Sequence, residues 1–172
     1  MTRIARAGLI VVATLAALAI GAALFVGTGV YNIGADDHHT RIVLTMIEQL
    51  RNRSIAVRAS GIAVPNLEDP RSIETGAAHY ARLCAGCHLA PGVTKSDIRA
   101  GLYPHPPNLA QEDVDDAQEA FWIIKHGIKM SAMPAWGKTL GDDAIWEIVS
   151  FVRHMPAMSA ETYQQLSTAR AQ

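Results

Sequence analysis

Residues 81–92 read ARLCAGCHLAPG and contain both cysteines of the chain, Cys84 and Cys87, with His88 directly after the second. In a helix, residues three and four positions apart are neighbours on one face. A single turn therefore presents two thiols and one imidazole to the same side. Four kinds of site use such groups: a disulfide, a redox-active dithiol, a zinc site and a covalently attached haem.

The spacing of these three residues favours the last of the four. A disulfide is possible outside the cytoplasm, and a redox-active Cys-x-x-Cys belongs with a βαβ pattern that this sequence lacks. A structural zinc site usually needs four ligands, and there is no second cysteine pair. Cys-x-x-Cys-His is the signature of c-type haem attachment. We therefore predict one covalently bound haem c, with thioethers from Cys84 and Cys87 and with His88 as an iron ligand.

A second iron ligand is predicted in the segment KMSAMPAW (129–136), where Met133 precedes a proline in a polar loop. A thioether sulfur suits haem iron, and His/Met ligation raises the reduction potential. Three alternatives for this ligand remain open at this stage: His105, His126 and Met130.

The N-terminal part of the chain has the character of a membrane anchor. Residues 7–30 are almost wholly apolar, and as a helix they extend about 36 Å, enough to cross a hydrocarbon core of about 30 Å. The apolar region of a signal peptide is only about 7–15 residues long, so we expect an uncleaved anchor over 1–35. Arg3 and Arg6 precede the apolar run, which predicts a cytoplasmic N-terminus with the rest of the chain in the periplasm.

The remainder is expected to be all-α, in three parts. Residues 36–67 hold an amphipathic helix at 40–58 and a linker, and this helix either lies against lipid headgroups or docks a partner subunit. Residues 68–157 form a small domain, and residues 158–172 a polar C-terminal tail that we expect to fray. Helices in the small domain are expected in the segment capped by Ser72, at 113–127 and at 142–155.

The stretch from about Arg71 to Met155 resembles a class I cytochrome c domain, and most closely the membrane-associated type of cbb-type oxidases and related respiratory chains. In that family a glycine and an aromatic residue lie eight and four positions before the first haem cysteine, as Gly76 and Tyr80 do here. The resemblance implies that the first and last helices cross closely at the glycine. On the last helix the matching contacts are Ile148 and Phe151.

Two further family motifs concern the haem ligands. Pro107, Asn108 and Leu109 match the Pro-Asn-Leu motif, in which the proline carbonyl accepts a hydrogen bond from the proximal histidine. The Met-Pro-Ala-aromatic motif is matched at 133–136, which implies Met133 as the sixth ligand and Trp136 as packing against the porphyrin. The di-haem subunit of those oxidases has two Cys-x-x-Cys-His sites, whereas this chain has one.

Composition and resemblance together predict a function. The chain has 15 Lys and Arg against 16 Asp and Glu, a formal net charge of −1, which argues against a basic nucleic-acid binder. We expect a membrane-anchored mono-haem cytochrome that is an electron carrier and not an enzyme, with redox proteins of a respiratory chain as partners. Two alternatives remain: a structural or anchoring subunit of a larger membrane oxidoreductase, and a haem-based sensor.

Overall fold

The computed structural model describes residues 2–168, and the regular structure in this range is helical, with no strand. The all-α prediction is confirmed. Two compact units divide the chain, Met1–Asp37 and His38–Gln172.

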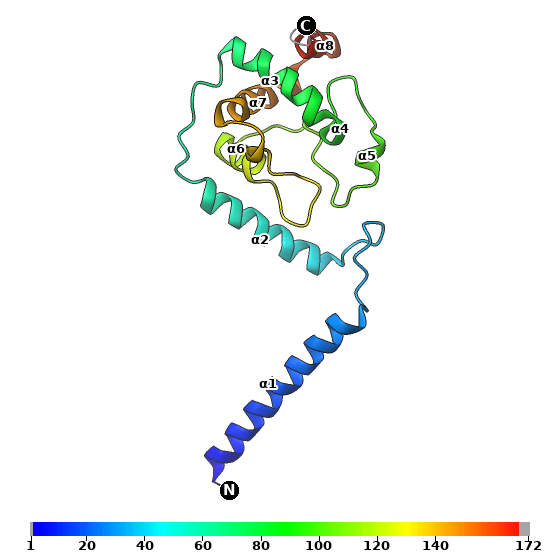
Figure 1. The fold of residues 1–172 in the computed structure, drawn as a ribbon, viewed down its shortest axis with the longest axis vertical. Coiled ribbons are helices and arrows are strands. Elements are labelled where there is room, and N and C mark those ends of the chain that lie inside the picture. Colours follow the sequence, from blue (N-terminus) through cyan, green and yellow to red (C-terminus); the bar gives the residue numbers. More distant parts are fainter. Residues whose placement is uncertain (1, 169–172) are drawn as a thin grey trace. The chain divides into compact units, whose positions relative to one another are not determined.

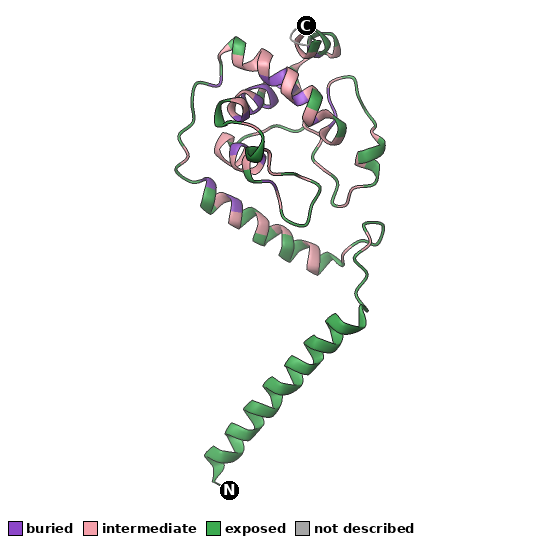
Figure 2. Ribbon diagram, in the orientation of Figure 1, coloured by how far each residue is buried: buried purple, intermediate pink, exposed green. Residues whose placement is uncertain are grey.

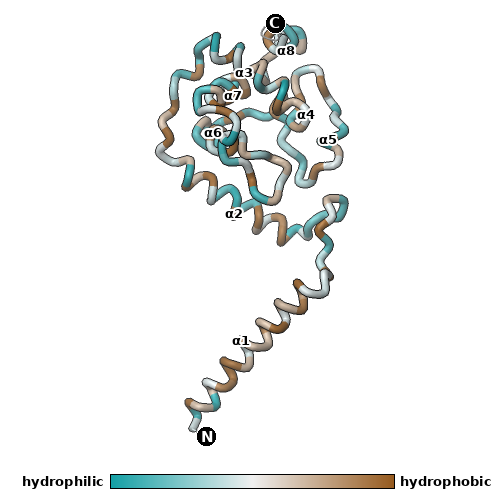
Figure 3. The backbone as a smooth tube through the Cα atoms, in the orientation of Figure 1, coloured by the Kyte–Doolittle hydropathy of each residue, from teal (hydrophilic) through white to brown (hydrophobic). Residues whose placement is uncertain are grey.

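The first unit contains the helix α1, Arg3–Thr28. The side chain of Thr2 caps its start by accepting a hydrogen bond from the Ala5 amide, and Gly29 ends it in a left-handed conformation. Every residue of α1 is exposed, and the hydropathy colouring of Figure 3 shows its apolar character along its length. Among the described residues, α1 is the one helix long and apolar enough to cross a membrane.

In the second unit, α3 and α7 cross in the core (Figure 1). Here α3 is Pro70–Leu83 and α7 is Asp142–His154. A Cβ atom added to Gly76 would lie 2.0 Å from the carbonyl oxygen of Glu147, so only glycine permits this approach. The rings of Tyr80 and Phe151 pack beside the crossing with their centroids 5.3 Å apart. In Figure 2 the buried residues concentrate on these two helices.

The other elements surround this pair. α6 packs on α7, α2 packs on α6, and α8 packs on α3. The short α4 follows α3 directly, and α5 contacts α4. Their bounds are α2 Arg41–Ala59, α4 Ala85–His88, α5 Asp97–Ala100, α6 Ala117–His126, η1 Trp136–Lys138, η2 Met155–Ala157 and α8 Ala160–Thr168.

The segment after α7 differs from the sequence-based expectation. Residues 160–168 do not fray; they form α8, whose Tyr163 is buried. The ring of Tyr163 lies 6.1 Å from that of Phe151, and the Ser159 side chain accepts a hydrogen bond from the Thr162 amide in the first turn. Leu166 of the same helix is half-buried and also packs against the core, so two side chains hold this otherwise polar helix.

Two helices begin at other residues than predicted. α3 begins at Pro70 and is capped by Asp69, whose carboxylate accepts from the Ser72 amide, so Ser72 is not the cap. Proline is favoured at the first helical position because its missing N–H is not needed there. α6 begins at Ala117, after the Asp116 cap, and not at residue 113.

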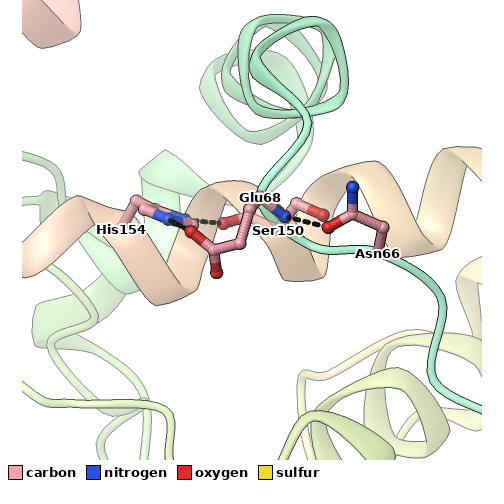
Figure 4. A network of polar contacts seen from close by, with 4 residues as sticks. All are labelled: Asn66, Glu68, Ser150 and His154. Atoms are coloured by element: carbon pink, nitrogen blue, oxygen red, sulfur yellow. Dashed lines mark hydrogen bonds and ion pairs between the residues drawn. The ribbon is translucent and has the colours of Figure 1, made fainter.

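Hydrogen bonds of Glu68 and His154 connect the linker before α3 to α7 (Figure 4). Nε2 of His154 lies 3.0 Å from the Glu68 carboxylate, and its Nδ1 lies 2.7 Å from the Ser150 carbonyl oxygen. Asn66 accepts a hydrogen bond from the Glu68 amide. Both histidine contacts are with acceptors, so the protonated ring satisfies both. The hydrogen bond to Ser150, followed by the interaction with Glu68, raises the pKa of His154.

Candidate functional site

Cys84 lies at the junction of α3 and α4, as the cap residue of both, and Cys87 and His88 lie on the single turn of α4. The turn is closed by backbone bonds from the Cys87 and His88 amides to the Cys84 carbonyl oxygen, at 3.0 and 2.9 Å. The two thiols are not joined to each other; Cys84 is buried and Cys87 half-buried. Burial raises the pKa of the Cys84 thiol to about 12. Redox dithiols depend on a depressed thiol pKa, so this environment argues against a thiol–disulfide catalyst.

The imidazole of His88 is oriented by the loop that follows. Its Nδ1 lies 3.1 Å from the Pro107 carbonyl oxygen, which can only accept, so Nδ1 carries the proton and Nε2 keeps its lone pair. The Leu109 amide donates to the carbonyl oxygen of His88 at 3.2 Å. Burial lowers the pKa of His88, which favours the neutral ring. A neutral imidazole whose second nitrogen is held by a carbonyl is the usual form of a metal-ligating histidine.

The chain turns sharply after His88, at Leu89. Leu89 has φ 62° and ψ −174°, a region that costs a residue with a side chain about 1–3 kcal/mol. Two contacts hold it there: the Leu89 side chain is buried, and the Tyr80 hydroxyl donates to its carbonyl oxygen at 2.6 Å. Tyr80 therefore supports the histidine turn as well as the helix crossing. The sequence indicated only that Tyr80 occupies the position of the family's aromatic residue, four residues before Cys84.

Arg99 is a second support that the sequence did not reveal. Its Nη2 donates to the Pro106 carbonyl oxygen at 3.0 Å, next to the peptide unit that holds His88. Its Nε is buried and has no hydrogen-bond partner among the described residues. The positive charge of Arg99 also contributes to the lowered pKa of His88, after burial. A lone arginine in a proline-rich loop carries no recognisable signal.

The loop between α6 and η1 separates the two candidate methionines. Met133 is half-buried and packs against the core, whereas Met130 is fully exposed. The Met133 carbonyl oxygen accepts from the Ile128 amide at 3.2 Å. Gly127 has φ 65°, and a Cβ there would lie 2.7 Å from that same oxygen. Glycine at this position therefore lets the methionine segment lie directly against the end of α6.

The other candidate ligands have different surroundings. His126 is exposed and its ring lies 4.8 Å from that of Trp122. His105 is exposed, with Nδ1 3.2 Å from the Arg99 carbonyl oxygen. Trp136 is half-buried and packs against the core. Over residues 2–168, no group of three or more His, Cys, Asp or Glu side chains is placed to hold a metal ion, so nothing in this part of the chain supports the zinc alternative.

Comparison with known families decides the nature of the domain. Residues 71–152 match the family described as cytochrome C oxidase, cbb3-type, subunit III. Residues 71–152 are a c-type cytochrome domain. The predicted resemblance is confirmed, and the role of such a domain is electron transfer, with haem as the cofactor that the family implies. No solved structure matches the chain.

The residues of this cytochrome domain fit a haem. Two thiols, a neutral imidazole with its free nitrogen and a half-buried thioether make a donor set that suits covalent attachment and low-spin iron. Cys84, Cys87 and His88 would hold it from α4, and Met133 from the loop after α6. When bound, haem iron supplies a one-electron couple.

Proposed function

We propose that the chain is a membrane-anchored mono-haem cytochrome that passes single electrons between proteins of a respiratory chain. Haem c is attached through Cys84 and Cys87, with His88 and Met133 as the axial ligands. The observation that carries this proposal is the His88 turn: the imidazole is held through Nδ1 by Pro107, next to two thiols that are not bonded to each other.

The protein contributes orientation and a dry environment. The Pro107 carbonyl sets the tautomer and direction of His88, and a carbonyl acceptor of this kind raises the basicity of the ligand. Met133 and Trp136, from the segment after α6, are half-buried and pack on the core.

Membrane anchoring through α1 is part of the proposal. The helix is long and apolar enough to cross a bilayer, and Arg3 and Arg6 precede its apolar run while Asp36 and Asp37 follow it. The positive-inside rule then places the N-terminus in the cytoplasm and the haem domain in the periplasm. A mature N-terminus located by mass spectrometry anywhere between residues 20 and 40 would contradict the retained anchor.

Covalent attachment is tested by extracting denatured protein with acidified acetone. The haem should stay with the polypeptide, and the double variant Cys84→Ser, Cys87→Ser should lose it. Haem that washes out of the wild type would overturn the proposal.

The axial assignment is tested with a matched pair of variants. Met133→Ala should abolish the weak red charge-transfer band of Met-ligated ferric haem and lower the reduction potential, because axial identity is a main determinant of a potential range of about 0.8 V. Met130→Ala is the control and should leave both unchanged, since its side chain is fully exposed. The reverse result would assign Met130.

Carbon monoxide distinguishes an electron carrier from a haem sensor. With Met133 bound in both redox states, ferrous protein should bind carbon monoxide slowly or not at all. Fast, tight binding would indicate an open coordination site and favour the sensor. A purely structural subunit would instead show no change of haem redox state during turnover of the complex with which it purifies.

A further inference from the structure

The helix α2 has two apolar faces, and the domain covers one of them. Ile55 and Ala59 are buried and Leu44 is half-buried, on the side where α2 packs against α6. Five other apolar side chains are exposed: Ile42 by 75%, Met46 by 65%, Ile47 by 46%, Leu50 by 73% and Val57 by 55%. We call Ile42, Met46, Leu50 and Val57 the outer stripe.

The outer stripe runs along one side of the helix and is interrupted by Arg53, between Leu50 and Val57. At about 100° per residue, its members fall within about 80° of one another and point away from the side of Ile55. Figures 2 and 3 show exposed and hydrophobic residues recurring along α2. A helix that is apolar on two opposite sides is expected to be covered on both. Among the residues that the structure describes, none covers the outer stripe.

The charges of α2 indicate what this cover is. The helix carries Arg41, Arg51, Arg53 and Arg58 against one acid, Glu48. Within residues 2–168 none of these arginines forms an ion pair. Arg53 lies within the angular range of the outer stripe. In a protein–protein groove an unpaired arginine there would be costly to bury, whereas at a bilayer surface its long side chain reaches lipid phosphates while the stem stays among the acyl chains.

The chain also keeps α2 close to a bilayer. Residues 29–40 connect α1 to α2, and a fully extended segment of that length reaches about 40 Å. If α1 crosses the membrane, α2 begins within that distance of its surface. A basic helix with an exposed apolar stripe is the type that lies in the plane of the interface and binds anionic lipids.

We propose that α2 lies on the membrane surface, with the outer stripe inserted between anionic lipid headgroups and its other face bound to α6. This inference rests on the proposed anchoring by α1. α2 packs on α6, which leads into the loop of Met133. Contact of α2 with the membrane surface therefore holds the cytochrome domain in a fixed orientation to the bilayer. A single transmembrane tether alone would leave the domain free to rotate.

The test uses photo-crosslinking of the full chain in nanodiscs of phosphatidylglycerol mixed with phosphatidylcholine. The photoreactive residue p-benzoylphenylalanine replaces Leu50 on the stripe or Asn52, which is exposed on another side of α2. Leu15 of α1 is the anchor control. We expect a lipid adduct, identified by mass, from position 50 and not from position 52. Phosphatidylcholine alone, or Arg53→Glu in the mixed discs, should reduce the yield.

Each outcome has a distinct meaning. A lipid adduct at position 15 without one at position 50 overturns the inference and leaves the anchor intact. No adduct at position 15 contradicts the anchor itself. Repeating the irradiation in native membranes shows whether lipid or protein contacts the stripe. An adduct of position 50 with a protein chain in place of lipid would refute the inference and assign the stripe to a partner subunit. Equal yields at positions 50 and 52 would show random collision with lipid and also refute the inference.

Discussion

Replacing Gly76 by alanine tests whether the α3–α7 crossing limits the stability of the cytochrome domain. The added methyl group would lie 2.0 Å from the carbonyl oxygen of Glu147, 2.6 Å from its carbonyl carbon and 2.9 Å from Cβ of Phe151. Two of these atoms are backbone, so a change of rotamer cannot relieve the contact. Both helices have to move apart.

The expected loss of stability follows from two opposing effects. Alanine is favoured over glycine in a helix interior by about 0.5–1 kcal/mol. Overpacking of a core typically costs about 1–3 kcal/mol and occasionally more, and a clash with backbone belongs at the upper end. We expect a net loss of about 2–3 kcal/mol in the free energy of unfolding, which lowers the melting temperature by roughly 10–20 °C for a domain of this size.

The assay is thermal unfolding of the purified full chain in detergent, followed by circular dichroism. Gly101→Ala is the matched control, because Gly101 has an ordinary φ of −90° and the nearest atom to an added Cβ is 3.8 Å away. This control should melt as the wild type does. A Gly76→Ala variant that also melts at the wild-type temperature would refute the view that the close crossing requires glycine.

Three further predictions concern the supports of the site and the linker. Tyr80→Phe removes the buried hydrogen bond to Leu89 and should lower the free energy of unfolding by about 1–3 kcal/mol, measured in a denaturant titration. The hydrogen bond to Ser150, followed by the interaction with Glu68, raises the pKa of His154 in the folded state, so these contacts add stability below about pH 6.5 that is lost as the pH rises through the folded pKa. His154→Gln should therefore be less stable than the wild type at low pH and equal to it at high pH. Arg99→Gln removes a positive charge near His88 and should lower the reduction potential in spectroelectrochemical titration, whereas Arg99→Lys keeps the charge and should lower it less. A wild-type potential in both variants would show that Arg99 does not support the site.

Local spacing was sufficient for much of the candidate site. Cys84, Cys87 and His88 lie within one helical turn, so their common face follows from helix geometry alone. The length of the apolar run likewise predicted a single long helix, which is α1. The proline next to Met133 set this residue apart from Met130 in the sequence, and its role as an iron ligand stays a prediction. Gly76 was found through its family position, and the structure explains why a side chain is excluded there.

Other features depend on which segments meet in space. Tyr80 reaches Leu89, and Arg99 reaches Pro106, because the turn after His88 and the loop beyond it fold back on α3 and α4. The sequence showed that α2 is amphipathic, but it did not show that Ile55 faces α6 while Leu50 faces outward, since both are apolar. The polar composition of residues 160–168 likewise concealed α8, because its packing depends on only two side chains, Tyr163 and Leu166. The spacing of apolar residues shows where they lie around a single helix. Which side of that helix is buried depends on the neighbouring element that packs against it.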